Sequence, residues 1–264
     1  MGLAVLEFQH LSVRYGAGVE ALRDATLSLA EGRVTAIIGG NGAGKSTMLR
    51  AASGLLGFHG GTITDGDVLL GGDPISKLSA AKIVELGVVH VPEGRRVFGD
   101  LTVIDNLRAG AATVKSGRKR DQKLAEVLEL FPILAERRNQ RAGLLSGGQQ
   151  QMLAISRGMM SSPKVILLDE PTLGLAPQTV EQVASVITQI NALGITVGVV
   201  EQNAAMALRI SDYGYVIEQG HVVLEDEAAP LRDSPDVQKL FLGGDAVETE
   251  SEAHEYKTLS RWSA

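Results

Sequence analysis

The stretch "VTAIIGGNGAGKST", residues 34–47, constrains the fold of this chain more than any other feature. Its first part is a continuous apolar run, as is typical of a strand that is buried on both faces. A glycine-rich turn follows, and the residues from Lys45 to about Leu56 are expected to form a helix. Strand, glycine-rich loop and helix in this order, with the pattern G-x-x-x-x-G-K-[ST], are typical of a phosphate-binding loop rather than of a plain glycine-rich turn. The stretch therefore predicts an α/β core built around a phosphate cradle.

The residue types of the cradle suit phosphate binding. Gly42 and Gly44 allow backbone conformations that a side chain would hinder, so successive amides can converge on a β-phosphate, and the helix start adds its positive dipole end. We expect the catalytic Lys45 to reach the β- and γ-phosphate oxygens and the Ser46 hydroxyl to take one ligand position of Mg²⁺. The predicted nucleotide-binding residues of the cradle are Gly39, Gly40, Asn41, Gly42, Ala43, Gly44, Lys45, Ser46 and Thr47.

A second apolar run, "VILLDE" at residues 165–170, ends in two carboxylates. Ligands of α/β sheets bind at the carboxyl ends of the strands. Asp169 is therefore expected to hold Mg²⁺, directly or through water, and Glu170 to activate the attacking water as a general base. A solvated carboxylate pair is the alternative, and the nearby cradle argues against it. Together the motifs predict a Mg²⁺-dependent nucleoside triphosphatase, and the absence of an "NKxD" guanine-binding motif from the sequence favours ATP over GTP.

Periodicity indicates how the rest of the chain is organised. The first forty residues alternate and contain glycine breaks, which predicts an antiparallel layer. Residues 102–160 have a helical pattern, within which the charged run "SGRKR" at 116–120 is expected to be an exposed loop. Residues 212–226 are typical of a hairpin that turns at Gly220. Because strands alternate with helices elsewhere, the main sheet should be largely parallel.

Composition excludes several classes of protein. Hydrophobic residues make up 44% and charged residues 21% of the chain, as in an ordinary globular protein. Aromatic residues are only 4% and the net charge is -6, which argues against a nucleic acid partner. The chain has no cysteine, so it forms no disulfide. No apolar run approaches the roughly 18 residues of a membrane helix, and the N-terminus has no signal-peptide pattern, so any membrane role is expected to come through a partner.

A third motif, "LSGGQQQ" at residues 145–151, precedes "ILLDEPTLGL" by about twenty residues. Together with "GGNGAGKST", this order of motifs resembles the ATP-binding cassette (ABC) ATPases over essentially residues 3–243. The resemblance implies an α/β fold of the P-loop NTPase class, with a mixed sheet core, an N-terminal antiparallel β layer and an inserted helical subdomain. We expect one ABC ATPase domain at residues 1–243, its helical subdomain at about 95–160, and an acidic, mobile tail at 244–264.

In that family two cassettes face each other head to tail, and each signature loop contacts the ATP that the other cradle holds. The resemblance therefore implies an anion-binding helix start, for which a Ser N-cap without a ligand is the alternative. It also implies that Tyr15 stacks on adenine, unless Tyr15 has an ordinary packing role. Ala176 stands where the family usually has Asp. The signature residues with an implied nucleotide contact are Ser146, Gly147, Gly148 and Gln149.

Two positions depart from the common family pattern. Glu93 stands where most cassettes have Gln, and Gln202 stands where most have His. Both departures resemble the ATP-binding subunits of branched-chain amino acid importers, although drift that damages the enzyme is the alternative. Glu93 is expected to face the nucleotide and Mg²⁺. Gln202 is expected to be catalytic, as a hydrogen-bond donor to the γ-phosphate that cannot become cationic, which predicts weak basal turnover with little histidine-like pH dependence.

The resemblance also implies partners. These are a second cassette subunit, two permease subunits and, indirectly, an extracytoplasmic substrate-binding protein, with the chain peripheral at the cytoplasmic face of the inner or plasma membrane. A heterodimer of cassettes is implied, and a homodimer stays chemically possible. The loop with Arg95, Arg96 and Phe98 mixes charge with an apolar anchor, so it is either a docking surface for the permease or a solvated loop with one packed Phe.

Other functions remain open at this point. The cassette of a urea or short-chain amide importer is the nearest alternative, although Gln is expected near residue 93 in the urea type. An exporter of lipid or polysaccharide is expected to have the usual His and Gln. A soluble cassette ATPase of DNA repair or translation usually has two cassettes, coiled coils or basic arms. The intact Glu170 argues against a non-catalytic nucleotide binder.

Overall fold

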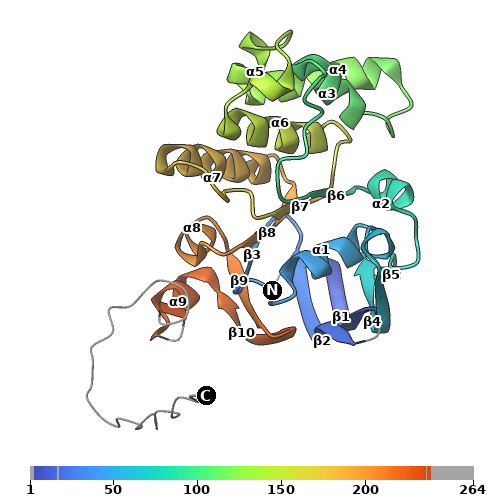
Figure 1. Ribbon diagram of the computed structural model, residues 1–264, viewed down its shortest axis with the longest axis vertical. Helices are drawn as coiled ribbons and strands as arrows, with labels where there is room; N and C mark the ends of the chain where they lie inside the picture. The colour runs from blue at the N-terminus through green and yellow to red at the C-terminus, as the bar shows by residue number, and fades with distance from the viewer. Residues whose placement is uncertain (1–2, 17, 236, 239–264) are drawn as a thin grey trace, which may run out of the picture.

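The computed structural model describes residues 3–16, 18–235 and 237–238, and its strands form two sheets (Figure 1). The tail predicted at residues 244–264 lies outside the described residues. The larger sheet has six strands in the order β10–β9–β3–β8–β7–β6, and the smaller has four in the order β2–β1–β4–β5. Among the described residues, no helix is both long and apolar enough to cross a membrane.

The larger sheet is parallel except at one edge. Strand β3 pairs in parallel with β8 and β9, and β7 pairs in parallel with β6 and β8, whereas β10 is antiparallel to β9. Strands β3, β7 and β8 are buried along their whole length, as expected of central strands that are covered on both faces. The strands are β3 (Val34–Ile38), β6 (Val88–Val91), β7 (Val165–Asp169), β8 (Thr196–Glu201), β9 (Tyr213–Glu218) and β10 (His221–Glu227).

The hairpin predicted at residues 212–226 is confirmed as β9 and β10. Its two turn residues, Gln219 (φ 48°) and Gly220 (φ 87°), both have left-handed backbones, as a two-residue turn between twisted antiparallel strands requires.

The smaller sheet is antiparallel throughout. The layer predicted for the first forty residues is confirmed, but it consists of two long strands. Two further strands, which follow α1, were not predicted. The sequence of the first, "GTITDGDVLL", has little apolar alternation and only its Gly61 and Val68 are buried, and the second has only two residues, both exposed. The strands are β1 (Ala4–Tyr15), β2 (Val19–Ala30), β4 (Gly61–Leu70) and β5 (Asp73–Pro74).

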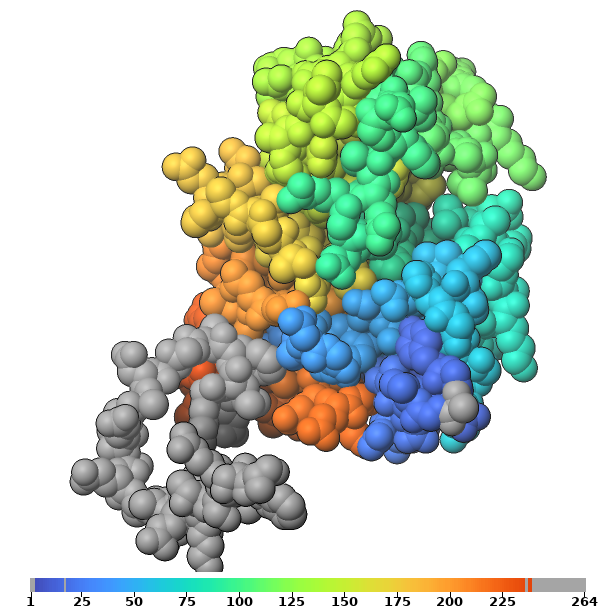
Figure 2. All heavy atoms as spheres, viewed as in Figure 1, coloured from blue at the N-terminus to red at the C-terminus, as the bar shows by residue number. Residues whose placement is uncertain are grey.

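The helices cover the sheets unevenly. Helices α3 to α6 gather at one end of the molecule, beyond α7, and form the lobe at the top of Figures 1 and 2. The α-helices are α1 (Lys45–Ala52), α2 (Ala80–Leu86), α3 (Val103–Gly110), α4 (Gly117–Leu130), α5 (Pro132–Glu136), α6 (Gly147–Met159), α7 (Pro177–Ala192), α8 (Ala204–Arg209) and α9 (Ala228–Asp233). Two short 3₁₀ helices are η1 (Gly57–His59) and η2 (Ala142–Leu144).

Two local expectations were wrong. Helix α1 ends at Ala52 rather than near Leu56, because Gly54 adopts a left-handed conformation (φ 69°) that ends the helix. The charged run 116–120 is exposed but it is not a loop, since Ser116 caps the start of α4 and residues 117–120 form its first turn. The Ser116 hydroxyl accepts a hydrogen bond from the Lys119 amide at 3.4 Å, which is the usual role of a serine at a helix start.

Three hydrophobic cores cover the larger sheet in the described residues, and the smallest of them joins β3 and β9 to α8 and α9. The two larger cores flank the site. One core joins β6, β7 and β8 to the helices α3 to α7, and the other joins the sheet to the antiparallel layer, α1 and α2. Parallel pairing directs the carboxyl ends of β3, β6, β7 and β8 to the same edge. The segments that leave this edge carry all the predicted residues of the cradle and the two carboxylates.

Candidate active site

The cradle joins β3 to α1 through a loop in which glycine is required. Gly44 precedes the helix with a φ of 110°, and a Cβ atom there would lie 2.5 Å from the Ala21 carbonyl oxygen and 2.7 Å from Leu22 Cδ2. A side chain at this position would therefore meet both backbone strain and a close neighbour. Helix α1 has no acidic residue in its first turn, so its exposed amides keep their attraction for an anion.

Lys45 is buried and its ammonium group is fully engaged. Its Nζ donates to the carbonyl oxygens of Gly39 (2.8 Å) and Gly40 (3.0 Å) and lies 3.5 Å from Glu170 Oε1. The side chains of Lys45 and Glu170 are 4% and 8% exposed, respectively. The lysine thus lies along the loop that it is predicted to serve, and its charge is balanced by the predicted general base.

Two of the three predicted metal ligands, Ser46 and Asp169, lie together, and the third, Glu93, lines the cavity of the cradle. The Ser46 hydroxyl, in the first turn of α1, donates a hydrogen bond of 2.9 Å to Oδ1 of Asp169, the last residue of β7. Both groups offer oxygen atoms, the ligand type that Mg²⁺ prefers, and their close approach leaves them able to share one small cation. The residues therefore fit a magnesium site completed by phosphate oxygens and water.

Glu170 is held at the edge of the sheet by its backbone and by Gln202. Its φ of 46° is left-handed, and its amide donates to the Val200 carbonyl at 2.9 Å. Gln202 Nε2 donates to both carboxylate oxygens of Glu170 at 2.9 Å and also lies 2.5 Å from Asn41 Oδ1. Gln202 thus connects the predicted base to the cradle, and a neutral amide can do so at any pH.

A cavity of about 520 Å³ brings most of these residues together. Its walls include residues 41–47 of the cradle together with Glu93, Glu170 and Gln202. Tyr15 does not line it. The Tyr15 hydroxyl lies 3.3 Å from Thr47 Oγ1, and the half-buried ring packs on the second core, in keeping with the packing alternative.

The signature residues lie outside this cavity, at the start of α6. Ser146 and Gln149 form a capping box, in which the Ser146 hydroxyl accepts from the Gln149 amide at 3.4 Å and Gln149 Oε1 accepts from the Ser146 amide at 3.1 Å. Ser146 is exposed. No acidic residue occupies the first turn of α6, so this helix start also suits an anion. Ala176, at the start of α7, offers no side-chain cap.

Packing, which the motif alone did not indicate, explains both signature glycines. A Cβ atom on Gly147 would lie 2.9 Å from Cζ and from both terminal nitrogens of Arg95, so the guanidinium group lies flat against this glycine. A Cβ atom on Gly148 would collide with the Thr179 side chain of α7. The glycines therefore allow close approach of neighbouring groups, in addition to any exposure of their amides.

The loop after β6 contacts the start of α6 through Arg95 and reaches the cavity of the cradle through Glu93. Arg95 contacts the signature helix, whereas Arg96 is exposed and its Nε donates to the Glu93 carbonyl at 3.3 Å. Phe98 is about half exposed, and the Arg157 guanidinium carbon lies 4.9 Å from the centre of its ring. Burial lowers the pKa of Arg157 from its ordinary value. Arg96 and Phe98 are thus accessible to solvent, whereas Arg95 packs against the signature helix.

Three functional candidates were missed in the sequence. Arg50 lines the cavity from the next turn of α1. A single arginine in a helical sequence does not indicate that its side chain faces a binding site. Glu201 is buried at the end of β8, where its Oε1 accepts from the amide (2.9 Å) and hydroxyl (2.7 Å) of Thr172. Burial raises the pKa of Glu201, an effect that these hydrogen bonds oppose. His90, on β6, faces Asp169. In the sequence, only the position of His90 in the predicted strand that leads to Glu93 could have indicated a role.

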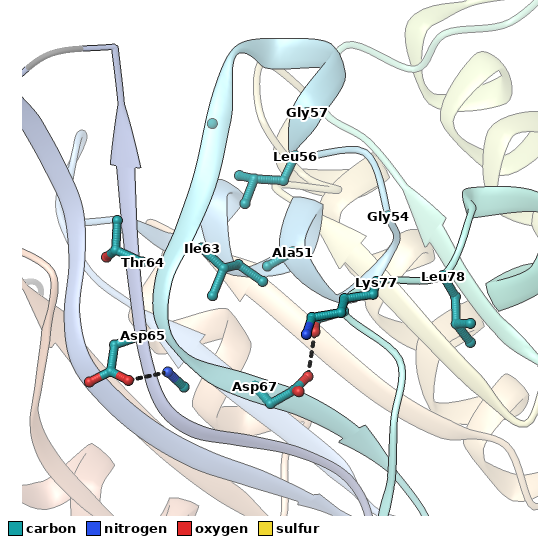
Figure 3. A pocket seen from close by; sticks show the side chains of 13 residues that line it. Ala51, Gly54, Leu56, Gly57, Ile63, Thr64, Asp65, Asp67, Lys77 and Leu78 are labelled. Atoms are coloured by element: carbon teal, nitrogen blue, oxygen red, sulfur yellow. Dashed lines mark hydrogen bonds between the residues drawn. The ribbon is translucent and has the colours of Figure 1, made fainter.

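A second cavity, of about 480 Å³, lies beside β4 and the end of α1 (Figure 3). Its acidic groups are already engaged, because Asp65 Oδ1 accepts from the Gly66 amide and Asp67 Oδ1 accepts from the Ser76 hydroxyl and the Val68 amide. It contains none of the predicted phosphate-binding residues. The chemistry therefore concentrates in the cavity of the cradle.

Comparison with known proteins identifies the family. The family model described as "ABC transporter" matches residues 22–173. The chain belongs to the ABC transporter family. The resemblance inferred from the three motifs is therefore confirmed, and this ABC cassette is an ATPase that binds nucleotide.

Individual relatives of the cassette cover nearly its whole length. It is 44% identical to the high-affinity branched-chain amino acid transport ATP-binding protein BraG of Pseudomonas aeruginosa, with 91% of this chain and 100% of BraG covered. It is 32% identical to the high-affinity branched-chain amino acid transport ATP-binding protein BraF of the same organism, with 92% of this chain and 99% of BraF covered. The crystal structure of the ADP conformation of MJ1267, an ATP-binding cassette of an ABC transporter, has a TM-score of 0.80 and 26% identity, with 92% and 100% covered. The predicted fold class is thereby confirmed.

Proposed function

We propose that this cassette is the ATP-hydrolysing, energy-coupling subunit of an importer for branched-chain amino acids. The observation that carries the proposal is the cavity in which Glu93 and Gln202, the two departures from the common pattern, meet Lys45, Ser46 and Glu170. Random drift of the sequence would not be expected to keep Glu93 and Gln202 in the same cavity as the residues of the cradle. The extent of the similarity to BraG supports the choice of transported substrate.

The contacts suggest how the residues act during hydrolysis. When ATP enters, Lys45 exchanges the carbonyl oxygens of Gly39 and Gly40 for phosphate oxygens, which form stronger, charge-assisted bonds. This exchange also loosens the pair between Lys45 and Glu170, and it leaves Glu170 free to accept a proton from the attacking water. Gln202, which now holds Glu170, becomes the donor that orients the base and the γ-phosphate.

Ser46 and Asp169 would hold Mg²⁺, with Glu93 on the cavity wall as a further acidic group. The ion, when bound, neutralises charge that develops on the phosphate oxygens. The chain's own contribution is to bring a hydroxyl group and a carboxylate from two distant segments to within 2.9 Å of each other.

The signature helix start is proposed to bind the γ-phosphate in a second cassette. Ser146 is exposed, the start of α6 has no acid to compete with a phosphate, and these residues are absent from the cavity of their own chain. The binding partner is either another copy or a distinct cassette, as the existence of BraF beside BraG in one organism suggests. ATP held between two such surfaces would join them, and hydrolysis would release them.

The remaining partners follow from the same proposal. Two permease subunits would contact the loop with Arg96 and Phe98 and would hold the cassette at the cytoplasmic face of the membrane, and an extracytoplasmic binding protein would deliver the substrate. Residues 1–243 would form the ATPase domain, with about 95–160 as the helical subdomain that moves the permeases.

Uptake in the native host tests the proposal. We expect deletion of this chain to abolish most high-affinity uptake of labelled leucine, isoleucine and valine, and expect the wild-type chain, but not Lys45→Ala, to restore it. Urea and short-chain amides are measured in parallel. Normal amino acid uptake with lost amide uptake would favour the alternative importer, and normal uptake of both would overturn the import proposal.

A further inference from the structure

His90 is a buried histidine that faces the predicted metal ligand. It lies on β6, and β7, which ends in Asp169, is its neighbour in the sheet. Its side chain is 3% exposed, and its Nε2 lies 3.8 Å from Asp169 Oδ2. Among the described residues, this nitrogen has no hydrogen-bond partner. A buried imidazole nitrogen without a partner is costly, so its position beside a carboxylate requires a reason.

The other ring nitrogen defines the hydrogen-bonding state of His90. Nδ1 lies 3.1 Å from Ser53 Oγ, near the end of α1. The Ser53 hydroxyl donates its single proton to the Leu49 carbonyl oxygen at 2.8 Å, so its oxygen is left to accept from Nδ1–H. In the neutral tautomer that carries this proton, the lone pair is at Nε2. That lone pair and Asp169 Oδ2 are two acceptors side by side in a buried place.

Two acceptors at this separation can share one donor that has two protons, which is a water molecule. Asp169 Oδ1 is already engaged by Ser46, so a bond to Oδ2 would hold the carboxylate at both oxygens. We propose that His90 is a positioning residue for Asp169, and that its Nε2 and Asp169 Oδ2 accept from one shared water, which holds the carboxylate in the orientation that a divalent cation needs. The inference rests on the proposed role of Asp169 and adds a residue to it.

The neighbours of His90 argue against ordinary core packing. Val88, which lies on the same face of β6 as His90, is fully buried in the second core. An apolar side chain at position 90 would have suited the same surroundings without unsatisfied polar atoms. Partners of metal-binding side chains commonly affect metal affinity by roughly 10- to 100-fold, so the proposed role is measurable.

The experiment compares substitutions that keep different atoms of the ring. His90→Gln places an amide group near the position of Nε2, His90→Asn reaches only to the position of Nδ1, and His90→Leu removes both. Binding of Mn²⁺ is measured by electron paramagnetic resonance on the full chain with a non-hydrolysable ATP analogue. We expect the Kd of Mn²⁺ to rise about tenfold for Leu and Asn and by less than about threefold for Gln. The affinity for the analogue in EDTA should not change.

Ser53→Ala provides a variant with a smaller effect on folding, and it should weaken Mn²⁺ binding to an intermediate extent. Wild-type Mn²⁺ affinity in His90→Leu, or equal weakening in the Gln and Leu variants, would overturn the inference. Asp169→Asn separates the two proposals. If this substitution leaves Mn²⁺ binding intact, the assignment of the metal site fails. If it abolishes binding while the His90 variants have no effect, only the inference about His90 fails.

Discussion

The cradle and the signature helix each present backbone amides at a helix start, yet their side chains are engaged in different ways. In the cradle, Lys45 reaches Glu170, Ser46 reaches Asp169, and Gln202 reaches both Glu170 and Asn41. Except for the contact between Gln202 and Glu170, these contacts connect segments more than a hundred residues apart in the chain. At the signature, the hydrogen bonds that the Ser146 and Gln149 side chains make within the described residues are to each other's backbone amides.

This difference indicates which half of the reaction centre one chain can build alone. The cradle has Lys45, Glu170 and Gln202 within one cavity, so its chemistry can be derived from a single copy. The signature helix has an exposed serine and a start without an acidic residue, but its residues do not line the cavity that the described residues of its own chain form. An exposed serine at a helix start of this kind has a function if a second molecule supplies the phosphate that it binds.

The largest predicted effect is on the cradle. Glu170→Gln removes the general base while it keeps the shape of the side chain. We expect kcat for ATP hydrolysis to fall by about 10²- to 10⁴-fold, with nucleotide affinity changed by less than about threefold. Phosphate release and binding of a fluorescent ATP analogue measure the two quantities, with the exposed Glu136→Gln as a control. A kcat within threefold of the wild type would show that Glu170 is not the base.

The next effect tests whether the signature serves another molecule. Ser146→Ala removes one hydrogen bond to a charged phosphate, and we expect ATPase activity to fall by about 10- to 100-fold. ATP binding to the dilute single chain should not change. In a homodimer, mixing Ser146→Ala with Lys45→Ala should restore activity that neither variant has alone, because one site of the mixed pair is intact. Full activity in a strictly monomeric sample would contradict the comparison.

A third prediction concerns the loop after β6, which contains Arg96. Arg96→Glu reverses an exposed charge on the proposed permease surface, so we expect transport to fall by about tenfold while ATP affinity stays the same. Transport into proteoliposomes and nucleotide binding are measured together. Lys119→Glu, an equally exposed reversal on α4, is the control. Equal losses in both variants would indicate a general charge effect instead of docking.

A fourth prediction concerns Gln202, which connects the cradle to the base. Gln202→Ala should lower turnover by about fivefold, as expected for the loss of one hydrogen bond. Gln202→His should introduce a pH dependence between about pH 6 and 7, since imidazole titrates there and an amide does not. Turnover is measured from pH 5.5 to 8.5. A histidine variant with wild-type turnover at every pH would remove the functional meaning of this departure.

The smallest effect concerns the support behind the cradle. Because the pKa of Glu201 is raised in the folded protein, the folded state binds its proton more tightly than the unfolded chain does. The stability of the wild type therefore decreases as the pH rises from about 4.3, the ordinary value of Glu, through the raised pKa. Glutamine does not titrate, so the Tm of Glu201→Gln should gain a few degrees on the wild type over this window.

Thermal unfolding from pH 4 to 8 measures this gain, with the exposed Glu31→Gln as the control. A Tm difference that is independent of pH would show that the buried carboxyl group does not titrate in this range.

Much of the cradle could be predicted from the sequence, because its features are local. Gly44 precedes the helix that it enables, and Lys45 follows at once, so a short window of sequence contains both the conformation and the chemistry. The capping box of Ser146 and Gln149 is local in the same sense. In contrast, β4 was missed because its burial depends on partners in β1.

The sequence by itself determined the two helix starts, the order of their motifs and the membership of a family, because backbone conformation and capping depend on near neighbours in the chain. Only the tertiary structure decided that Ser46 meets Asp169, that Gln202 holds Glu170, and that His90 faces Asp169. The physical reason is the parallel sheet. Its register brings the carboxyl ends of strands that are far apart in the sequence to a common edge, and no local pattern contains that information.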